Sequence, residues 1–209
     1  MSSIQPTDIT MKLKRPARWE GWIPTYTGNG FNLLSPQPDD IRIEDLARGV
    51  AYKFRYSGQV SPITVAEHSV LVSTIIEILW PESKKMLAGL MHDACQAYTQ
   101  DIQTPVRKFI KVELPHGEVV SWNILEAKLN QAIAKHLGLE SRYWGAPEVK
   151  AANILAVALE KQQCPVLRRS GNWGLPSVPE QVAHLRLEFQ TPEQAEKSFL
   201  ERFQRLTAS

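Results

Sequence analysis

The fold of this chain is decided by the stretch TVAEHSVLVSTIIEIL, residues 64–79. Thr64, with Glu67 three residues later, fits a capping box at the start of a helix. Pro81 ends the predicted helix because proline cannot continue it. His68 lies one turn into this helix, on a segment whose remaining pattern is apolar. The apolar positions at helical spacing are Val70, Leu71, Ile75, Ile78 and Leu79.

Outward from this stretch, helix start and stop signals predict further helices on both sides. The glycine at Gly138 suits a helix end, and the loop-forming residues between Cys164 and Pro179 predict a loop. The expected helices run from Asp40 to about Tyr52, from about Glu82 to Tyr98, from Thr104-Pro105 over a short span, from about Gly117 to Leu137, from Ala146-Pro147-Glu148 through Leu159, and from Thr191-Pro192-Glu193 to about Leu206.

The length and composition predict one domain, and the helix signals predict that it is all-α. The chain has 209 residues, of which 43% are hydrophobic, so it can bury a core without disulfides. We expect a helical bundle of six to eight helices. Residues 1–40 form an irregular Pro/Gly-rich lead-in packed on the domain, with a short hairpin near Trp22–Leu34; no other strand pair is expected. Residues 41–163 form the helical core, and residues 164–209 add a loop and a C-terminal helix to the same domain.

Charge and cysteine usage exclude several classes of function. Lys and Arg total 24 against 22 Asp and Glu, so the net charge of +2 does not predict binding to long nucleic acid. The two cysteines, Cys95 and Cys164, form no C-x-x-C pattern, and no apolar run is long enough to span a membrane. We therefore expect a cytoplasmic protein with no membrane partner; a homodimer stays open.

The segment Leu90-Met91-His92-Asp93-Ala94 places two chemically active residues inside an apolar helical pattern. Neighbouring helical residues point about 100° apart, so both reach one ion only if it lies between them. His68 is the natural third donor. Nitrogen and carboxylate ligands together suit a divalent transition metal better than magnesium. Spacing alone leaves a structural role for these residues equally open, with each side chain satisfied by hydrogen bonds.

The motifs Val65-Ala66-Glu67-His68-Ser69 and Gly89-Leu90-Met91-His92-Asp93-Ala94 resemble the HD-domain metal-dependent phosphohydrolase superfamily. The resemblance is nearest to the branch of bacterial 5′-deoxynucleotidase-like proteins with phage and prophage relatives, and it runs from about residue 22 to 162. It implies an HD-type helical core over residues 41–163. It also implies hydrolysis of a nucleotide, a 5′-(deoxy)nucleotide phosphomonoester, with one divalent ion as cofactor: manganese, cobalt, nickel, iron or zinc.

The resemblance also implies roles for individual residues. His68, His92 and Asp93 would bind the metal, and Asn153 occupies the place of a later Asp ligand. Gln96 stands where the family has its catalytic acid, usually Glu. Asp101 fits a second acidic position, Arg55 resembles a substrate-facing arginine, and Glu160 fits another carboxylate common in the branch. With Tyr56, which adjoins Arg55, we expect Arg55 and Glu160 to bind substrate.

The departures at Gln96 and Asn153 bear on activity. Asn153 can ligate through its carbonyl oxygen, but it leaves net positive charge at the ion and weakens binding. An amide at position 96 cannot transfer a proton, which typically costs about 10²- to 10⁴-fold in rate. Asp101 would then be the remaining proton-transfer group. The active site is thus partly degenerate, and two hypotheses stay open: a slow phosphohydrolase, and a catalytically impaired protein that binds a nucleotide for sensing or sequestration.

Simpler interpretations apply to residues outside these motifs. The adjacent cations Arg107 and Lys108 are typical of a solvated helix face, although they could contact phosphate. Trp173 is expected to be core or lid material. Tyr56 could pack in the core or stack on a base. A purely structural helical partner is the third, least favoured hypothesis.

Overall fold

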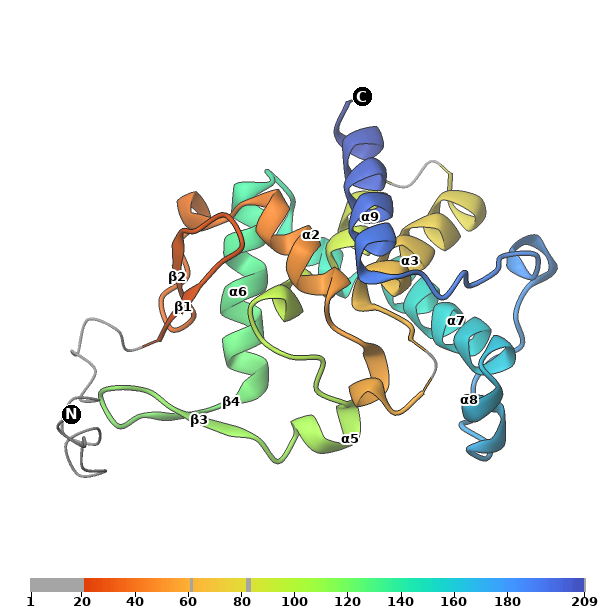
Figure 1. Ribbon diagram of the computed structural model, residues 1–209, viewed down its shortest axis with the longest axis horizontal. Coiled ribbons are helices and arrows are strands. Elements are labelled where there is room, and N and C mark those ends of the chain that lie inside the picture. Colours follow the sequence, from red (N-terminus) through yellow and green to blue (C-terminus); the bar gives the residue numbers. More distant parts are fainter. Residues whose placement is uncertain (1–20, 61, 82–83, 209) are drawn as a thin grey trace, which may run out of the picture.

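The structure is a computed structural model, and it describes residues 21–60, 62–81 and 84–208 (Figure 1). Helices dominate these residues, which confirms the all-α expectation at the level of secondary structure. The first twenty residues of the expected lead-in lie outside the described residues. The α-helices are α2 (Ile43–Ala51), α3 (Val65–Leu79), α4 (Met86–Met91), α5 (Thr104–Arg107), α6 (Trp122–His136), α7 (Pro147–Gln163), α8 (Pro165–Arg169) and α9 (Pro192–Thr207).

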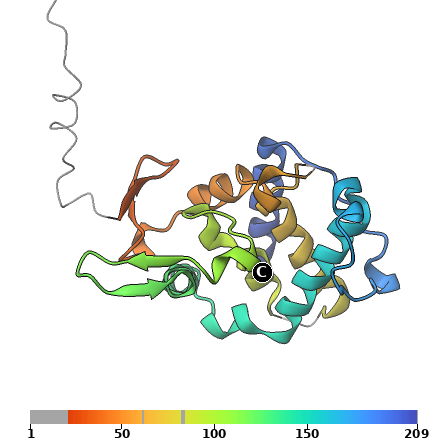
Figure 2. The same ribbon diagram turned by 90° about the horizontal axis from the view of Figure 1, so that it is seen from below.

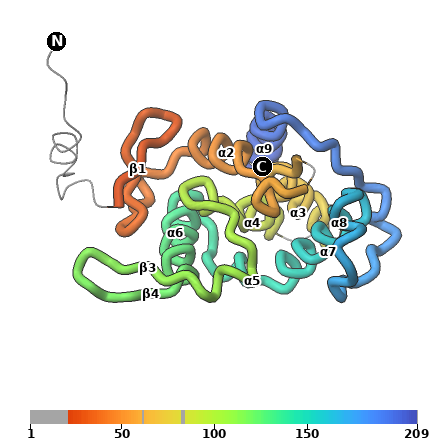
Figure 3. The backbone as a smooth tube through the Cα atoms, turned by 60° about the horizontal axis from the view of Figure 1, so that its bottom comes forward, coloured from red at the N-terminus to blue at the C-terminus, as the bar shows by residue number. Residues whose placement is uncertain are grey.

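Helix α3 is the centre of the bundle. The Thr64 side chain accepts the backbone N–H of Glu67 at 3.0 Å, so the predicted N-cap is confirmed. The other half of the expected box does not form, because the Glu67 carboxylate accepts the backbone N–H groups of Glu188 and Phe189 instead. Helices α2, α4, α7 and α9 all pack on α3, as Figures 1 and 3 show.

Two apolar clusters meet along α3. One joins α2, α4, α6 and α9 and includes Leu46, Leu90 and Phe199. The other joins the second half of α3 to α7 and α8, with Ile75 and Leu159 fully or almost fully buried. Residues of α3 contribute to both clusters, so burial of this one helix couples the two halves of the domain. Within the described residues, no helix combines the length and apolar character needed to cross a bilayer.

Two antiparallel hairpins flank the helices. The expected N-terminal hairpin is confirmed as β1 (Trp22–Pro24) and β2 (Gly30–Asn32). A second hairpin, β3 (Lys111–Glu113) and β4 (Val119–Ser121), extends beyond α6 (Figure 2) and corrects our expectation of a helix from about Gly117. Gly117 has φ of +85°, which places it in the turn rather than in a helix. Helix α6 therefore begins at Trp122.

Other helix limits also differ from expectation. Asp40 lies in a separate 3-10 turn (Pro38–Asp40), and α2 begins at Ile43. The helix expected over about 82–98 is split, because α4 ends at Met91 and a 3-10 helix covers Ala94–Ala97. Part of the expected loop after Cys164 is helix α8. The predicted starts at Pro147 and Pro192 are confirmed, the latter with a full capping box from Thr191 and Gln194.

Candidate metal centre

Three helices bring the predicted metal ligands together. His68 lies on α3, His92 directly follows α4, and Asn153 lies on α7. Close packing of α4 on α3 depends on Gly89, where an added Cβ would collide with the Ile76 side chain. This close approach places the His92 ring centre 5.2 Å from that of His68.

The His92-Asp93 pair does not lie within a continuous helix, which corrects our expectation. Asp93 has φ of −110° and ψ of 11°, so the backbone leaves the helical path at this residue. His92 Nε2 and Asp93 Oδ2 lie 3.2 Å apart as a result. The helix break therefore turns two adjacent side chains toward one point, which a regular helix would not do.

The His92 ring is oriented for ligation. Its Nδ1 lies 2.8 Å from the carbonyl oxygen of Gly89, so Nδ1–H donates to that oxygen in the neutral ring. The other nitrogen, Nε2, is buried and makes no hydrogen bond of good geometry, although Oδ2 of the ionised Asp93 lies 3.2 Å away. A buried lone pair without a donor is unfavourable in a metal-free site, and it is the atom that a metal ion would use.

His68 is held in the same way by a carboxylate. Its Nδ1 lies 2.7 Å from Oε1 of Glu160, and both side chains are completely buried. With the proton on Nδ1, the lone pair of Nε2 lies 3.0 Å from Oδ1 of Asn153. Two acceptor atoms at this distance repel each other unless the Asn153 amide turns its NH₂ group inward or a cation binds both atoms.

The donor atoms fit a single ion. Suitable atoms of His68, His92 and Asp93 all lie within 4.8 Å of one another, so this group could hold a metal ion. Two ligand atoms at right angles on an ion, each with a bond of about 2.1 Å, lie about 3.0 Å apart. The observed distances are close to this value: 3.2 Å from His92 Nε2 to Asp93 Oδ2 and 3.0 Å from His68 Nε2 to Asn153 Oδ1. Two imidazoles, one carboxylate and one amide oxygen form a donor set suited to a divalent transition metal.

Charges around the centre favour the deprotonated forms of Asp93 and His68 and the protonated form of His92. Burial would raise the pKa of Asp93, but His92, His68 and Arg55 outweigh it and hold this pKa well below its usual range. Burial lowers the pKa of His68, and the charge of Arg55 lowers it further. For His92 the nearby Asp93 carboxylate outweighs burial and raises the pKa. Asp93 is thus ionised and His68 neutral at neutral pH, as metal ligation requires.

Glu160 lies behind the centre rather than in the wall of the pocket. It is fully buried and accepts hydrogen bonds from Nε of Arg55 at 3.2 Å and from the Tyr56 hydroxyl, in addition to His68. Burial would raise its pKa, but Arg55 and His68 lower it to about 2. One ionised carboxylate therefore orients the predicted metal ligand His68 and two residues, Arg55 and Tyr56, that we expected to bind substrate together with Glu160 itself.

A pocket of about 620 Å³ opens beside the metal ligands. Gln96 lies in its wall and is almost completely buried, and its Oε1 has no hydrogen-bond partner. Burial raises the pKa of Asp101, although Arg55 opposes this effect. The pocket thus collects most of the residues singled out in the sequence, and it is lined by Arg55, Tyr56, Asp93, Gln96, Asp101, Ile102, Gln103, Thr104, Pro105, Arg107, Asn153, Val157 and Trp173.

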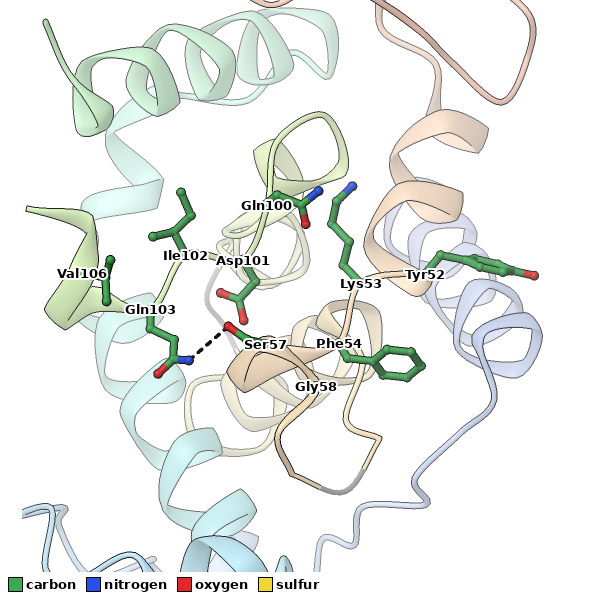
Figure 4. Close-up of a pocket in the computed structure, with 10 residues that line it drawn as sticks. All are labelled: Tyr52, Lys53, Phe54, Ser57, Gly58, Gln100, Asp101, Ile102, Gln103 and Val106. Atoms are coloured by element: carbon green, nitrogen blue, oxygen red, sulfur yellow. Dashed lines mark hydrogen bonds between the residues drawn. The ribbon is translucent and has the colours of Figure 1, made fainter. Parts of the chain in front are cut away.

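Asp101 also borders a second hollow, of about 500 Å³, on the other side of residues 101–103 (Figure 4). Gln103 Nε2 donates to Ser57 Oγ at 3.2 Å across this wall, and Figure 4 shows Asp101 and Gln103 both extending toward Ser57. Tyr56 and Ser57 have φ of 56° and 54°, a conformation that costs energy for residues other than glycine. Residues 101–103 between the two hollows are therefore hydrogen-bonded to a strained segment, Tyr56–Ser57.

The pocket also includes residues that we did not place in the site from the sequence, among them Arg107 and Trp173. Arg107 is not a freely solvated cation, because it donates to the Ile102 carbonyl and to Glu126 Oε2, the latter at 3.0 Å. Trp173 reaches the pocket from a loop after α8. Trp173 had only a weak signal, the flanking glycines of Gly171-Asn172-Trp173-Gly174, and Arg107 had none beyond its charge.

Comparison with known proteins places the chain among bacterial relatives. No family model matches the sequence. The chain is 34% identical over 150 residues to the uncharacterized protein RCAP_rcc00048 of Rhodobacter capsulatus, covering 68% of this chain and 72% of that protein. It is 29% identical over 142 residues to the uncharacterized protein YfdR of Escherichia coli K12, covering 68% of this chain and 71% of that protein. At this identity and coverage, the chain belongs to the same protein family as RCAP_rcc00048 of Rhodobacter capsulatus.

Proposed function

We propose that this chain is an HD-domain, metal-dependent phosphohydrolase that acts on a nucleotide, a 5′-(deoxy)nucleotide phosphomonoester. The observation that carries the proposal is the convergence of His68, His92 and Asp93 on one point at the edge of a pocket. Both histidines have an Nδ1 hydrogen bond, and each Nε2 faces an oxygen of another predicted ligand, Asn153 Oδ1 at 3.0 Å or Asp93 Oδ2 at 3.2 Å. The order of these residues along the chain also agrees with the HD-domain motifs.

The residues around the centre suit a phosphate ester. A divalent ion held by His68, His92, Asp93 and Asn153 would act as a Lewis acid toward the ester. The Arg55 guanidinium uses Nε for Glu160, and its NH1 lies 3.8 Å from Asp93. Its outer N–H groups therefore remain to bind phosphate oxygens beside the metal ligands.

Proton transfer falls to Asp101 in this proposal. It lies in the wall of the pocket, and partial burial raises the pKa of its carboxyl group. A carboxyl group that holds its proton more readily is the better donor to a leaving oxygen. Gln96 can hydrogen-bond to substrate or water, but its amide neither gives nor accepts a proton at neutral pH.

A second candidate function is binding of the nucleotide without turnover. The specific observation is that an amide, Gln96, stands at the position of the family's acid, where it is 2% exposed and its Oε1 has no hydrogen-bond partner among the described residues. Replacement of a ligating Asp by Asn153 also removes a negative charge that would repel phosphate. Both features favour affinity for an anion over its hydrolysis.

Metal analysis and phosphate release test the proposal. After exposure to manganese, cobalt, nickel, iron or zinc, we expect about one ion per chain and chelator-sensitive release of phosphate from 5′-nucleotides. His92→Ala should lose the ion, and His116→Ala, at an exposed histidine paired only with Glu118, should keep it. Absence of any bound ion in the wild type would refute both functions. An ion and a bound nucleotide without phosphate release would support the second.

A further inference from the structure

Trp173 adds an aromatic side chain to the wall of the pocket and has no contact with the predicted metal ligands among the interactions described above. It lies in the segment between α8 and the 3-10 helix Glu180–Val182, far along the chain from the ligands on α3 and α4. Its side chain nevertheless lines the same pocket as Arg55, Asp93 and Asn153. The C-terminal segment therefore contributes directly to the candidate site.

The indole ring of Trp173 is held in place. Its Nε1 donates to the carbonyl oxygen of Ser170 at 3.2 Å. The Lys161 ammonium lies 4.6 Å from the ring centre and donates to the Leu167 carbonyl at 2.7 Å. Gly171 and Gly174, with φ of +86° and +64°, form the turn that presents the ring. A ring fixed in this way is a preorganised binding surface.

Tyr56 completes this wall. The ring centres of Tyr56 and Trp173 lie 6.1 Å apart, with their planes at 50°, so the two rings form an aromatic corner. The Tyr56 hydroxyl donates to Glu160, the same carboxylate that holds Arg55 and the metal ligand His68. The Glu160 side chain therefore connects the aromatic corner to the end of the pocket where we propose that phosphate binds.

Trp173 is more exposed than the other tryptophans in the helical part of the chain. Trp80, Trp122 and Trp144 are partly buried against one of the two apolar clusters, whereas Trp173 lies at the surface beside Tyr56. Its side chain remains 39% exposed. The pocket surface around the corner is completed by Ile102, Pro105 and Val157, which suits a flat apolar group.

We propose that the aromatic corner of Tyr56 and Trp173 binds the planar base of a nucleotide whose phosphate lies at Arg55 and the metal ligands. The inference rests on the proposed function for the phosphate end and adds that the ligand is recognised by its base. Base stacking on an aromatic side chain tolerates different bases, because every base has a π-face. The corner thus selects nucleotides over simple sugar phosphates without selecting one base.

The test compares two compounds that differ only by the base, adenosine 5′-monophosphate and ribose 5-phosphate, on the metal-loaded protein. Calorimetry gives the Kd of each, and phosphate release gives KM and kcat. Trp173→Ala should weaken binding of the nucleotide by about 5- to 150-fold and leave that of ribose 5-phosphate unchanged. Trp173→Phe should retain most of the affinity, and Trp173→Leu should lose it. Trp22→Ala is the matched control, because Trp22 is equally exposed but lies on strand β1.

The outcomes separate this inference from the proposed function. Equal loss for both compounds, or no loss for either, would overturn the base-binding role while leaving phosphate binding at the metal centre intact. Failure of the wild type to bind either compound would overturn both proposals. Because Trp173→Phe and Trp173→Leu are compared directly, a folding defect of the alanine variant does not decide the result.

Discussion

Replacing Glu160 by Gln tests the carboxylate that organises the centre. Glu160 is fully buried, and its Oε1 lies 3.1 Å from Arg55 Nε and 2.7 Å from His68 Nδ1. A pKa lowered from 4.5 to about 2 corresponds to about 3 kcal/mol of stability at neutral pH. This agrees with the roughly 3–5 kcal/mol lost when one partner of a buried ion pair is removed.

We therefore expect Glu160→Gln to lower the free energy of unfolding of the metal-free protein by about 3 kcal/mol in urea denaturation at neutral pH. The difference should shrink as the pH falls from about 4.5 toward 2, because over this range the unfolded chain binds the proton and the folded wild type does not. Metal affinity, measured by competition with a chelator, should fall about 10- to 100-fold because His68 loses the group that fixes its tautomer.

The matched control is Glu193→Gln. Glu193 also accepts a hydrogen bond from a tyrosine hydroxyl, that of Tyr52, but at an exposed position on α9. It should change neither stability nor metal binding measurably. If Glu160→Gln unfolds at the wild-type urea concentration and keeps the wild-type metal affinity, the organising role of Glu160 is wrong.

Three further predictions concern the same region. Asn153→Asp should tighten metal binding about 10-fold, or about 1.4 kcal/mol, in the same chelator competition; an unchanged affinity would mean that residue 153 does not face the ion. Gln96→Glu combined with Asn153→Asp should raise phosphate release about 10- to 1000-fold, and an unchanged rate would argue against proton transfer from position 96. Burial lowers the pKa of Lys53 to about 8. The stability of the wild type relative to Lys53→Met should rise between about pH 8 and pH 10.5, where the unfolded chain binds more protons, and a pH-independent difference in denaturation would contradict this.

Local signals in the sequence predicted where several helices begin. The caps at Thr64 and Thr191 and the proline at Pro147 act within one turn of the chain, so their effect is already present in the local sequence. Interactions over longer distances reversed other expectations. The Glu67 carboxylate caps the backbone of Glu188 and Phe189, more than a hundred residues away, instead of its own helix.

The β3–β4 hairpin shows a signal that was present and misinterpreted. Pro115-His116-Gly117 separates Ile110-Lys111-Val112-Glu113-Leu114, where apolar and charged residues alternate, from the β-branched pair Val119-Val120, a pattern typical of a hairpin. Val119 also lies at helical spacing from Trp122, so the apolar pattern of helix α6 begins before the helix does. For this reason we expected the turn residue Gly117 at the start of a helix. The pairing of Val112 with Val120 distinguishes a hairpin from a helix here, because the spacing of apolar residues is ambiguous over so few positions.

The sequence by itself determined the helical class and predicted the group of His68, His92 and Asp93, which could hold a metal ion, because amphipathic spacing and residue chemistry are properties of the chain. Tertiary structure alone decided that the chain breaks at Asp93, that Glu160 lies behind the centre, and that Trp173 reaches the pocket. The physical reason is distance along the chain. Glu160 and His68 are 92 residues apart, so their hydrogen bond exists only once α7 has packed on α3.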